Sequence, residues 1–342
     1  TLLMLCFLLG YIFYSTGFFR SIENRFNGQV AHKIPIPGVE DLQISYEDHF
    51  ALLSSDDRAA RRDGHSQAGH LYYLDLRDPK SPLLQLTQDL PFQFYPHGIS
   101  MVKIGENKYR IFAINHVPQA RRVENSIEVF DLEGKRLSHI KTLKDPKMIS
   151  PNDLVALDGE RFYFSNDHGD TQGLRRLAED YLAWGASNVV YFDGSDYKVV
   201  AENLAYANGI NFDQKNQRLF VASTRKFFVR VFDVQEDGSL EKIEDIPCGT
   251  GVDNIEFGPE GRIWIGCHPS LLTFVSYAQA KRDISPSEII RLDYQGKGDY
   301  QKDIIYLNDG QAISACSVAA PYEDMILVGA VMDTHFLILQ EN

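Results

Sequence analysis

Residues 150–170, with the sequence SPNDLVALDGERFYFSNDHGD, decide the fold class, because polar clusters frame two short apolar runs joined by a turn. Asn152 and Asp153 precede the first run, and Asn166, Asp167 and His168 follow the second. Asn and Asp are poor strand formers and good turn formers, so the pattern predicts two antiparallel strands with polar ends. The two clusters are either plain surface turns or side chains that point to one binding site.

The same arrangement of a polar opening followed by short strands recurs along the chain. Apolar, β-branched and aromatic runs predict strands at 70–76, 109–115, 126–132, 161–166, 188–194, 218–223, 229–234, 262–267, 288–294 and 325–330. Polar openings recur at intervals of roughly 45–60 residues, at 39–41, 96–99, 151–153, 207–209, 252–254 and 314–316. A four-stranded unit repeated six times predicts an all-β, six-bladed β-propeller, with a β-sandwich as the alternative.

Two further segments fit this architecture. Residues 29–36, QVAHKIPI, are predicted to form a strand that closes the last blade against the first. Residues 173–184, GLRRLAEDYLAW, carry apolar side chains at helical spacing and predict a helix. Because the first strand of each propeller blade lines the central channel, we expect the six polar openings to converge on the axis.

The first twenty residues form a separate segment. Residues 1–19 carry no charge, and a helix of that length spans about 28 Å, close to the hydrocarbon core of a bilayer. The chain opens on Thr1 rather than Met, so we expect a short preceding piece. We predict a retained transmembrane or signal-anchor helix over 1–20, in preference to a cleaved signal peptide or a buried helix.

This anchor divides the chain into three predicted parts: the anchor at 1–20, a linker and closing strand at 21–37, and a propeller hydrolase domain at 38–342. The propeller would then lie outside the cytosol, on the periplasmic, extracellular or lumenal side of a membrane. The anchor would contact membrane lipid and offers a route to an oligomer.

The net charge and the cysteine spacing exclude two classes of function, nucleic-acid binding and a cysteine-based zinc site. The formal net charge is −13, and the chain has no run of Lys and Arg, so nucleic acid is not an expected partner. The four cysteines lack zinc-ligand spacing. Three of them lie in or beside apolar strands, where a thiol behaves as a small hydrophobe.

Carboxylates and amides dominate the residues that would meet at the propeller axis. These polar residues are Glu40, Asp41, His97, Asn152, Asp153, Asn208, Asp253 and Asn254. Unpaired carboxylates are costly to bury, and a calcium ion resolves that cost because it takes six to eight oxygen ligands. Adjacent strand residues face opposite ways, so the doublets Glu40–Asp41 and Asn152–Asp153 predict two calcium ions at different depths. Taken singly, each Asn or Asp among them is more typical of a turn, and it is the recurrence of these residues in register that favours a metal site.

Four histidines lie at strand ends or blade openings. His97 and His116 belong to one predicted blade and can act as a general base and its orienting partner. His168 and His268 end strands in later blades, where a hydrogen-bonded structural role is the alternative.

Eight motifs in this order resemble the paraoxonase/arylesterase family of calcium-dependent lactonases. They are GVEDLQI, PHGIS, INHV, SPNDLVAL, FSNDHG, ANGI, GVDNIEFGPEGRIWIGCHP and SVAAPYEDMILVGAV, and they extend from residue 38 to about residue 335. The resemblance implies a six-bladed propeller with two calcium ions in a central tunnel and an uncleaved hydrophobic N-terminus.

The resemblance also implies roles for individual residues. The catalytic calcium would be bound by Glu40, Asn152, Asn208, Asp253 and Asn254. The structural calcium would be bound by Asp41, Asp153 and the backbone carbonyl of Ile99. His97 and His116 match the family's proposed histidine dyad, and Asp253 is a rival base or nucleophile. Asp167, His168 and Trp264 match positions beside the ligands or in the pocket, and His268, at the end of a strand, is expected with them.

The chain departs from the family in two places. Mammalian members join the N-terminal and last strands by a disulfide, and the positions near Gln29 and Ile338 hold no cysteine here. The segment 56–69, which corresponds to a loop that shapes substrate choice, differs in composition and is rich in arginine.

Taken together, these observations predict a calcium-dependent hydrolase that opens lactones, including acyl-tailed lactones, and also cleaves aryl esters and, weakly, phosphotriesters. A membrane-tethered calcium-bound propeller that binds without catalysis is one alternative. A lyase similar to strictosidine synthase on the same fold is another.

Overall fold

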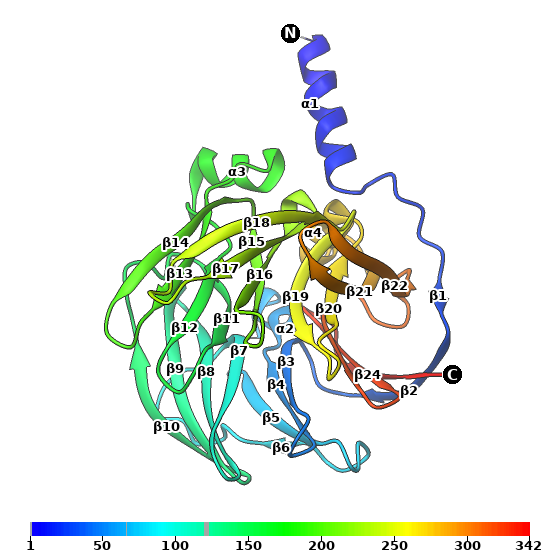
Figure 1. Ribbon diagram of the computed structural model, residues 1–342. Coiled ribbons are helices and arrows are strands. Elements are labelled where there is room, and N and C mark those ends of the chain that lie inside the picture. Colours follow the sequence, from blue (N-terminus) through cyan, green and yellow to red (C-terminus); the bar gives the residue numbers. More distant parts are fainter. Residues whose placement is uncertain (1, 66, 120–122) are drawn as a thin grey trace.

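Six antiparallel sheets surround a central axis in the computed structural model, which describes residues 2–65, 67–119 and 123–342 (Figure 1). The innermost strand of each sheet contacts the innermost strands of its neighbours, and the ring closes from the sixth sheet to the first. The innermost strands, in blade order, are β3 (Val39–Ser45), β7 (Pro96–Gly105), β11 (Pro151–Ala156), β15 (Ala207–Asp213), β19 (Gly251–Phe257) and β23 (Cys316–Tyr322). The predicted six-bladed propeller is therefore confirmed, and each blade begins at a predicted polar opening.

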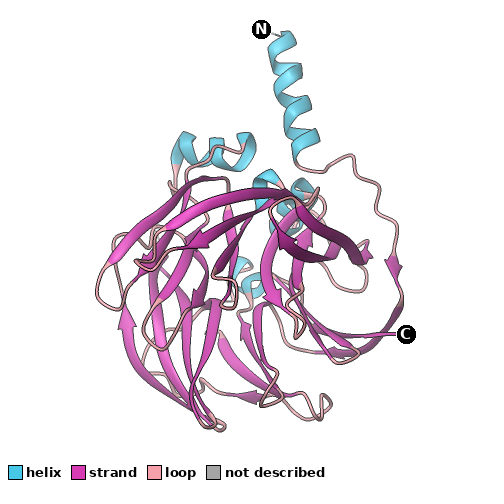
Figure 2. Cartoon of the chain, viewed as in Figure 1, coloured by secondary structure: helices cyan, strands magenta, loops and turns pink. Residues whose placement is uncertain are grey.

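The remaining strands follow outward in each blade, and strands dominate the chain (Figure 2). The second strands are β4 (Phe50–Ser55), β8 (Lys108–Pro118), β12 (Phe162–Asn166), β16 (Arg218–Ser223), β20 (Ile263–His268) and β24 (Met325–Ala330). The third strands are β5 (His70–Asp75), β9 (Val123–Glu133), β13 (Ser187–Phe192), β17 (Phe228–Val234), β21 (Ser287–Gly296) and β25 (Phe336–Glu341). The outer strands are β6 (Leu84–Gln85), β10 (Arg136–Leu143), β14 (Tyr197–Leu204), β18 (Leu240–Pro247), β22 (Asp299–Asn308) and β2 (Gly28–Ile34). All ten strands predicted from the sequence are present.

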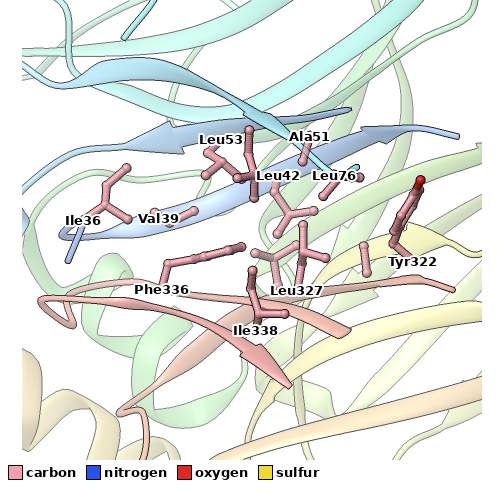
Figure 3. Close-up of a cluster of buried hydrophobic side chains, with 13 residues drawn as sticks. Ile36, Val39, Leu42, Ala51, Leu53, Leu76, Tyr322, Leu327, Phe336 and Ile338 are labelled. Carbon is pink, nitrogen blue, oxygen red and sulfur yellow. The ribbon is translucent and has the colours of Figure 1, made fainter. Parts of the chain in front are cut away.

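The sixth blade contains strands from both ends of the chain. Strand β2 pairs with β25, with Gln29 opposite Gln340 and His32 opposite Ile338, so the predicted closing strand at 29–36 is confirmed. Between the sixth and first blades, Leu42, Leu327 and Phe336 belong to one buried cluster (Figure 3). Burial of each such side chain contributes about 1.5–3 kcal/mol, so packing and strand pairing close the ring without a disulfide.

Hydrophobic packing lies between blades rather than in one central core. Six clusters of buried side chains each join a pair of adjacent blades. Both faces of most inner strands are consequently buried, which explains why their sequences are continuous apolar runs as well as alternating ones. The axis is left to the polar residues at the blade openings.

A register shift interrupts the innermost strand of every blade close to its first residues. In β3 the shift falls between Val39 and Asp41, in β11 between Pro151 and Leu154, and in β15 between Ala207 and Ile210. The other three blades repeat the irregularity. Such bulges bend a strand and redirect its side chains, so the six openings present polar groups that a regular ladder would turn elsewhere.

Three helices lie on one face of the propeller, which we call the helical face (Figure 1). They are α1 (Leu2–Ser15), α3 (Gly173–Leu182) and α4 (Leu271–Ala278), and α3 confirms the helix predicted at 173–184. The sequence did not predict α4, because the segment LLTFVSYA is apolar almost throughout and shows no clear period. The short α2 (Arg58–Arg62) was not predicted either, and five residues are too few to show a helical period.

The N-terminal segment contains a helix that is shorter than predicted. Helix α1 has 14 residues, and none of the helices among the described residues is long and apolar enough to cross a membrane. After α1 the chain passes outside the fifth blade, where β1 (Arg25–Phe26) pairs with β22. Thr1 of the predicted anchor and Ser66 of the segment 56–69 lie outside the described residues.

Candidate functional site

A cavity of about 320 Å³ opens toward the helical face at the centre of the ring. Glu40, Asn152, Asn208 and Asp253, from four different blades, line its polar end together with His97 and His268. Helix α4 lines the opposite side with the apolar Leu271, Leu272, Phe274 and Val275. The cavity thus combines a polar floor on the propeller axis with an apolar wall, which is typical of a small-molecule site.

The two residues of each polar doublet point in different directions, one to the cavity and one to the backbone of an adjacent blade. Glu40 and Asn152 line the cavity, whereas their neighbours Asp41 and Asp153 turn to the backbone of adjacent blades. Asp41 accepts from the amide of Ile99 at 2.7 Å, and Asp153 accepts from the amide of Ile210 at 2.8 Å. The alternation expected from strand geometry is present.

Four oxygens of the predicted catalytic set find no hydrogen-bond donor among the described residues. They are Oε2 of Glu40 and the Oδ1 atoms of Asn152, Asn208 and Asn254, and all four are buried. The amide of Asn254 is oriented by donating to the backbone oxygen of Glu40 at 2.8 Å and to its Oε1 at 2.9 Å. Buried oxygens without donors cost free energy, and a hard cation is the partner that matches carboxylate and amide oxygens at one place.

Electrostatics of the carboxylates favour a cation as well. Burial raises the pKa of Glu40, the charge of Arg58 opposes this shift and the nearby Asp253 adds to it, so that the pKa is about 7. Burial also raises the pKa of Asp41 and Asp153 well above the usual range, and their mutual repulsion adds to the shift at Asp41. Without a counter-charge, these groups would hold protons rather than ionise.

The structure adds a residue that the sequence did not single out. Glu256 of β19 is buried, and burial together with Asp153 raises its pKa well above the usual range. It interacts with Gln43, whose Oε1 accepts from the amide of Met101 at 2.6 Å. Its position two residues after Asn254 in an innermost strand is the signal that could have identified it.

His97 is held by an arginine from α2. Nη2 of Arg58 lies 2.7 Å from Nδ1 of His97, and the same guanidinium donates to the backbone oxygen of Pro96 at 3.1 Å. A guanidinium can only donate, so Nδ1 of His97 accepts and the neutral ring carries its proton on Nε2. Burial, followed by the charge of Arg58, lowers the pKa of His97 well below its usual value.

The ring of His116 contacts the ring of His97, but the side-chain hydrogen bond of His116 is with Asn125. The ring centroids are 4.9 Å apart with the planes at 68°, and Nδ1 of His116 lies 2.8 Å from Oδ1 of Asn125. The Asn125 amide donates to the backbone oxygens of Met148 and Ile149, so its oxygen faces the ring and His116 donates. The lone pair of neutral His116 is therefore on Nε2, and His116 does not belong to the described residues that line the cavity.

Asp253 and His268 form a buried pair at the polar end of the cavity. Nε2 of His268 lies 2.7 Å from Oδ2 of Asp253, and each residue exposes about 2% of its surface. The His268 ring stacks on Phe274 of α4, with centroids 4.2 Å apart. The sequence predicted His268 beside the ligands or in the pocket, and the structure places it in direct contact with Asp253 of the predicted ligand set.

The second polar cluster of residues 150–170 forms a chain of ionic contacts behind Asn152. Nδ1 of His168 lies 2.6 Å from Asp167, and its Nε2 lies 2.9 Å from Asp180 of α3. Burial alone would lower the pKa of His168, but the two carboxylates outweigh it and raise the pKa to about 9. Asp167 in turn accepts from Asn152 at 3.4 Å, so the cluster connects α3 to the cavity floor.

Trp264 lies farther from the cavity than the resemblance suggests. It belongs to the hydrophobic cluster between the fifth and sixth blades, with the guanidinium of Arg291 5.8 Å from its ring centroid. It is not one of the described residues that line the cavity.

The donor set at the axis differs from that of a typical transition-metal site. Within the described ranges, no group of three or more His, Cys, Asp or Glu side chains is placed to hold a metal ion. The predicted catalytic set instead combines two carboxylates with three amide side chains, an all-oxygen set of the kind that calcium prefers over zinc.

Fold and site together define a six-bladed propeller with an oxygen-rich axial pocket. Comparison with known proteins identifies the particular family: the sequence model of the arylesterase family matches residues 63–338, and the chain belongs to this family.

Several characterised relatives have similar sequences. Serum paraoxonase/arylesterase 2 of Rattus norvegicus is 31% identical over 269 residues, covering 77% of this chain and 74% of that protein. Serum paraoxonase/arylesterase 1 of Homo sapiens is 29% identical over 303 residues, covering 86% and 83%. Serum paraoxonase/lactonase 3 of Homo sapiens is 28% identical over 271 residues, covering 78% and 75%.

Solved structures with low sequence identity share the fold alone. A luciferin-regenerating enzyme superposes with a TM-score of 0.55 at 11% identity, covering 92% of this chain and 94% of that chain. A calcium-binding protein, regucalcin, from Agrobacterium tumefaciens superposes with a TM-score of 0.52 at 14% identity, covering 93% and 94%.

Proposed function

We propose that this protein is a calcium-dependent hydrolase that opens lactones and also cleaves aryl esters and, weakly, phosphotriesters. The observation that carries the proposal is the set of four buried oxygens without donors on the floor of a cavity with an apolar wall. Family membership supports it, because the relatives are named as arylesterases, paraoxonases and a lactonase.

Two groups of residues would hold two calcium ions. Glu40, Asn152, Asn208, Asp253 and Asn254 would hold the ion at the cavity floor. Asp41, Asp153 and the backbone carbonyl of Ile99 would hold a deeper, structural ion. When bound at the floor, calcium supplies positive charge that polarises the substrate carbonyl and stabilises negative charge on its oxygen.

The chain's own residues would orient the substrate. Leu271, Phe274 and Val275 of α4 form an apolar surface opposite the polar floor. A lactone with an alkyl tail would place its ester group on the floor and its tail against α4, since apolar contact is favourable only on that side. The site would thereby select neutral, amphipathic esters.

Proton transfer is better assigned to Asp253 than to His97. Nδ1 of His97 is occupied by Arg58, and Nε2 carries the proton of the neutral ring, so His97 donates rather than accepts toward the cavity. Asp253 lines the cavity, is acceptor-only when ionised, and is held by His268. We propose that Asp253 accepts the proton of the attacking water and that His97 and His116 orient the polar groups beside it.

A panel of γ- and δ-lactones and phenyl esters tests the hydrolase proposal. With calcium, the purified protein is expected to open lactones of at least one chain length and to lose that activity in EDTA. Recovery of activity on adding calcium back is the matching control. Turnover of no lactone or ester in calcium would refute the proposal and favour the propeller as a binding module, and turnover unaffected by EDTA would refute its calcium dependence.

We also infer that the protein associates with lipid on the extracytoplasmic side of a membrane. Leu2, Leu3, Met4 and Phe7 of α1 and Trp184 after α3 are exposed large apolar residues of the helical face. Apolar side chains gathered on one face are typical of an interfacial surface.

Flotation with phosphatidylcholine vesicles is expected to carry the full chain upward, while a variant with Leu3 and Phe7 replaced by Glu stays at the bottom. Equal flotation of both proteins would contradict the inference.

A further inference from the structure

One residue near the junction of α1 and the following segment, Thr16, is buried beside the cavity. Residues 15–20, which we call the junction segment, consist of the last residue of the exposed helix α1 and the five residues after it. Leu2 and Met4 of α1 are each 75% exposed, whereas Thr16 is only 2% exposed and lines the cavity described above. An N-terminal segment that served only as a membrane anchor would not need to bury a residue against the cavity.

Backbone contacts hold the junction segment against the start of α4. The amide of Leu271 donates to the backbone oxygen of Thr16 at 2.9 Å. Gly17 has φ of +70°, and a Cβ at this position would lie 2.3 Å from the backbone oxygen of Pro269. Only glycine fits both this conformation and this distance, so the close approach is encoded in the sequence.

A buried arginine joins the junction segment to α3. Arg225 is 4% exposed and donates to the backbone oxygen of Ser15 at 2.9 Å and to its hydroxyl at 3.1 Å. It also donates to the backbone oxygens of Asp180 and Tyr181, each at 2.7 Å. Because these acceptors are uncharged, the buried guanidinium depends on complete hydrogen bonding, and it would lose two of these four bonds if the junction segment left.

A second contact holds the end of the junction segment. The guanidinium of Arg20 makes two hydrogen bonds to the carboxylate of Glu288, whose side chain is 1% exposed. Arg225 and Arg20 thus attach the segment to the fourth and fifth blades at both of its ends. A bidentate pair of this kind fixes geometry as well as adding energy.

Four residues from separate elements meet at this wall of the cavity. Thr16 comes from the junction segment, Tyr181 from α3, Arg225 follows β16, and Leu271 begins α4. The hydroxyl of Thr16 donates back to the carbonyl of Ile12 at 2.7 Å, so it is already satisfied within the chain. A ligand at Thr16 therefore finds no free O–H donor, and an alkyl tail, which has no donor of its own, meets only the volume of the side chain.

We propose that Thr16 is a wall of the substrate pocket that sets how long an alkyl tail the pocket accepts, and that Arg225 is the positioning residue that holds it there. The inference rests on the proposed lactone hydrolysis, because it names the substrate feature that the pocket selects. With this role for Thr16, the N-terminal segment is part of the substrate site, and substrate selectivity depends on the position of the junction segment against α3 and α4.

Hydrolysis of γ-alkyl-γ-lactones from methyl to nonyl by the full chain in calcium tests this assignment. Thr16→Leu is expected to lower kcat/KM for the nonyl lactone about tenfold, mainly through KM, and to change the methyl lactone less than about twofold. Thr16→Val, which keeps the volume, should retain the wild-type selectivity. Thr171→Leu, at an exposed threonine before α3, is the matched control and should change neither substrate.

The role of Arg225 is tested by Arg225→Lys, which keeps the charge but cannot make the four hydrogen bonds. It is expected to raise KM for the nonyl lactone several-fold with little change in kcat, and its effect should not add to that of Thr16→Leu. Arg175→Lys on α3, whose side chain is 85% exposed, is the matched control. Equal changes for all chain lengths in Thr16→Leu, or strict additivity of the two substitutions, would overturn the inference.

Binding of non-hydrolysable γ-lactams with the same alkyl groups, measured by calorimetry, keeps the two proposals distinguishable. If the wild type opens no lactone but Thr16→Leu selectively weakens binding of the nonyl lactam, the proposed function fails and the pocket wall stands. If the wild type opens lactones but Thr16→Leu changes neither hydrolysis nor lactam binding in a length-dependent way, the pocket wall is refuted and the proposed function stands.

Discussion

Asp253→Asn is expected to lower kcat/KM for lactone hydrolysis about 10³-fold, the largest effect of any single substitution at the site. Asp253 lines the cavity floor, is 2% exposed and is paired with His268 at 2.7 Å. Asparagine keeps the shape and can still accept from His268, but it removes the proposed proton acceptor and a negative charge that would face the proposed calcium ion. Steady-state kinetics with calcium in excess measure the loss.

Two comparisons identify what Asp253 contributes. Asp299→Asn, on the exposed edge of β22, should stay within about twofold of wild type and controls for the loss of a charge. His97→Gln should lose less than Asp253→Asn, because Arg58 already occupies Nδ1 of His97. A loss of about 10³-fold in His97→Gln with a small loss in Asp253→Asn would contradict this assignment and give the proton-accepting role to His97.

Calcium removal is expected to destabilise the fold, and more strongly at pH 8 than at pH 5. The pKa of Glu40 is raised from 4.5 to about 7 by burial and Asp253, and the pKa values of Asp41, Asp153 and Glu256 are raised too. A carboxyl whose pKa is raised in the folded state binds more protons there than in the unfolded chain, so stability falls as pH rises from about 4.5 to about 7. For Glu40 alone the difference is on the order of 3 kcal/mol.

Bound calcium would cancel this penalty because it stabilises the ionised carboxylates. EDTA should therefore lower Tm by about 5–10 °C at pH 8 and by much less at pH 5, as measured by scanning calorimetry. Glu40→Gln should flatten the pH dependence of the calcium-free protein, and Glu236→Gln, at an exposed position, should not. An identical Tm with and without EDTA at both pH values would contradict a calcium role in stability.

The repeated pattern made the architecture predictable. Polar openings such as Pro151–Asp153 and Ala207–Gly209, each followed by short apolar runs, indicated six blades, and the structure has six sheets that begin at those positions. The closing strand was predictable for the same reason, since an unpaired β-forming segment before the first blade needs a partner and finds it in β25. Local strand and turn patterns were enough to predict the architecture, because the strands of a blade, apart from the closing strand, lie close together along the chain and each blade packs only on its neighbours.

Other features could not be read from local patterns. The sequence suggested that His97 and His116 form a dyad, but it could not show that Arg58 reaches His97 from a separate helix. Nor did it indicate Glu256, α4 as the apolar wall, or Thr16 beside the cavity. These features depend on contacts between residues distant along the chain, which no periodicity records.

The sequence by itself determined the number of blades, the closure of the ring and the set of oxygen-bearing residues at the axis, because strand periodicity and recurrent openings are local properties of the chain. Only the tertiary structure decided which oxygens are left without donors and which nitrogen of His97 is occupied. It also decided that a segment predicted as part of a membrane anchor ends inside the pocket. The physical reason is that hydrogen bonding, burial and pKa depend on neighbours brought together by folding, and the stretch at residues 150–170 specifies only its own strands and turns.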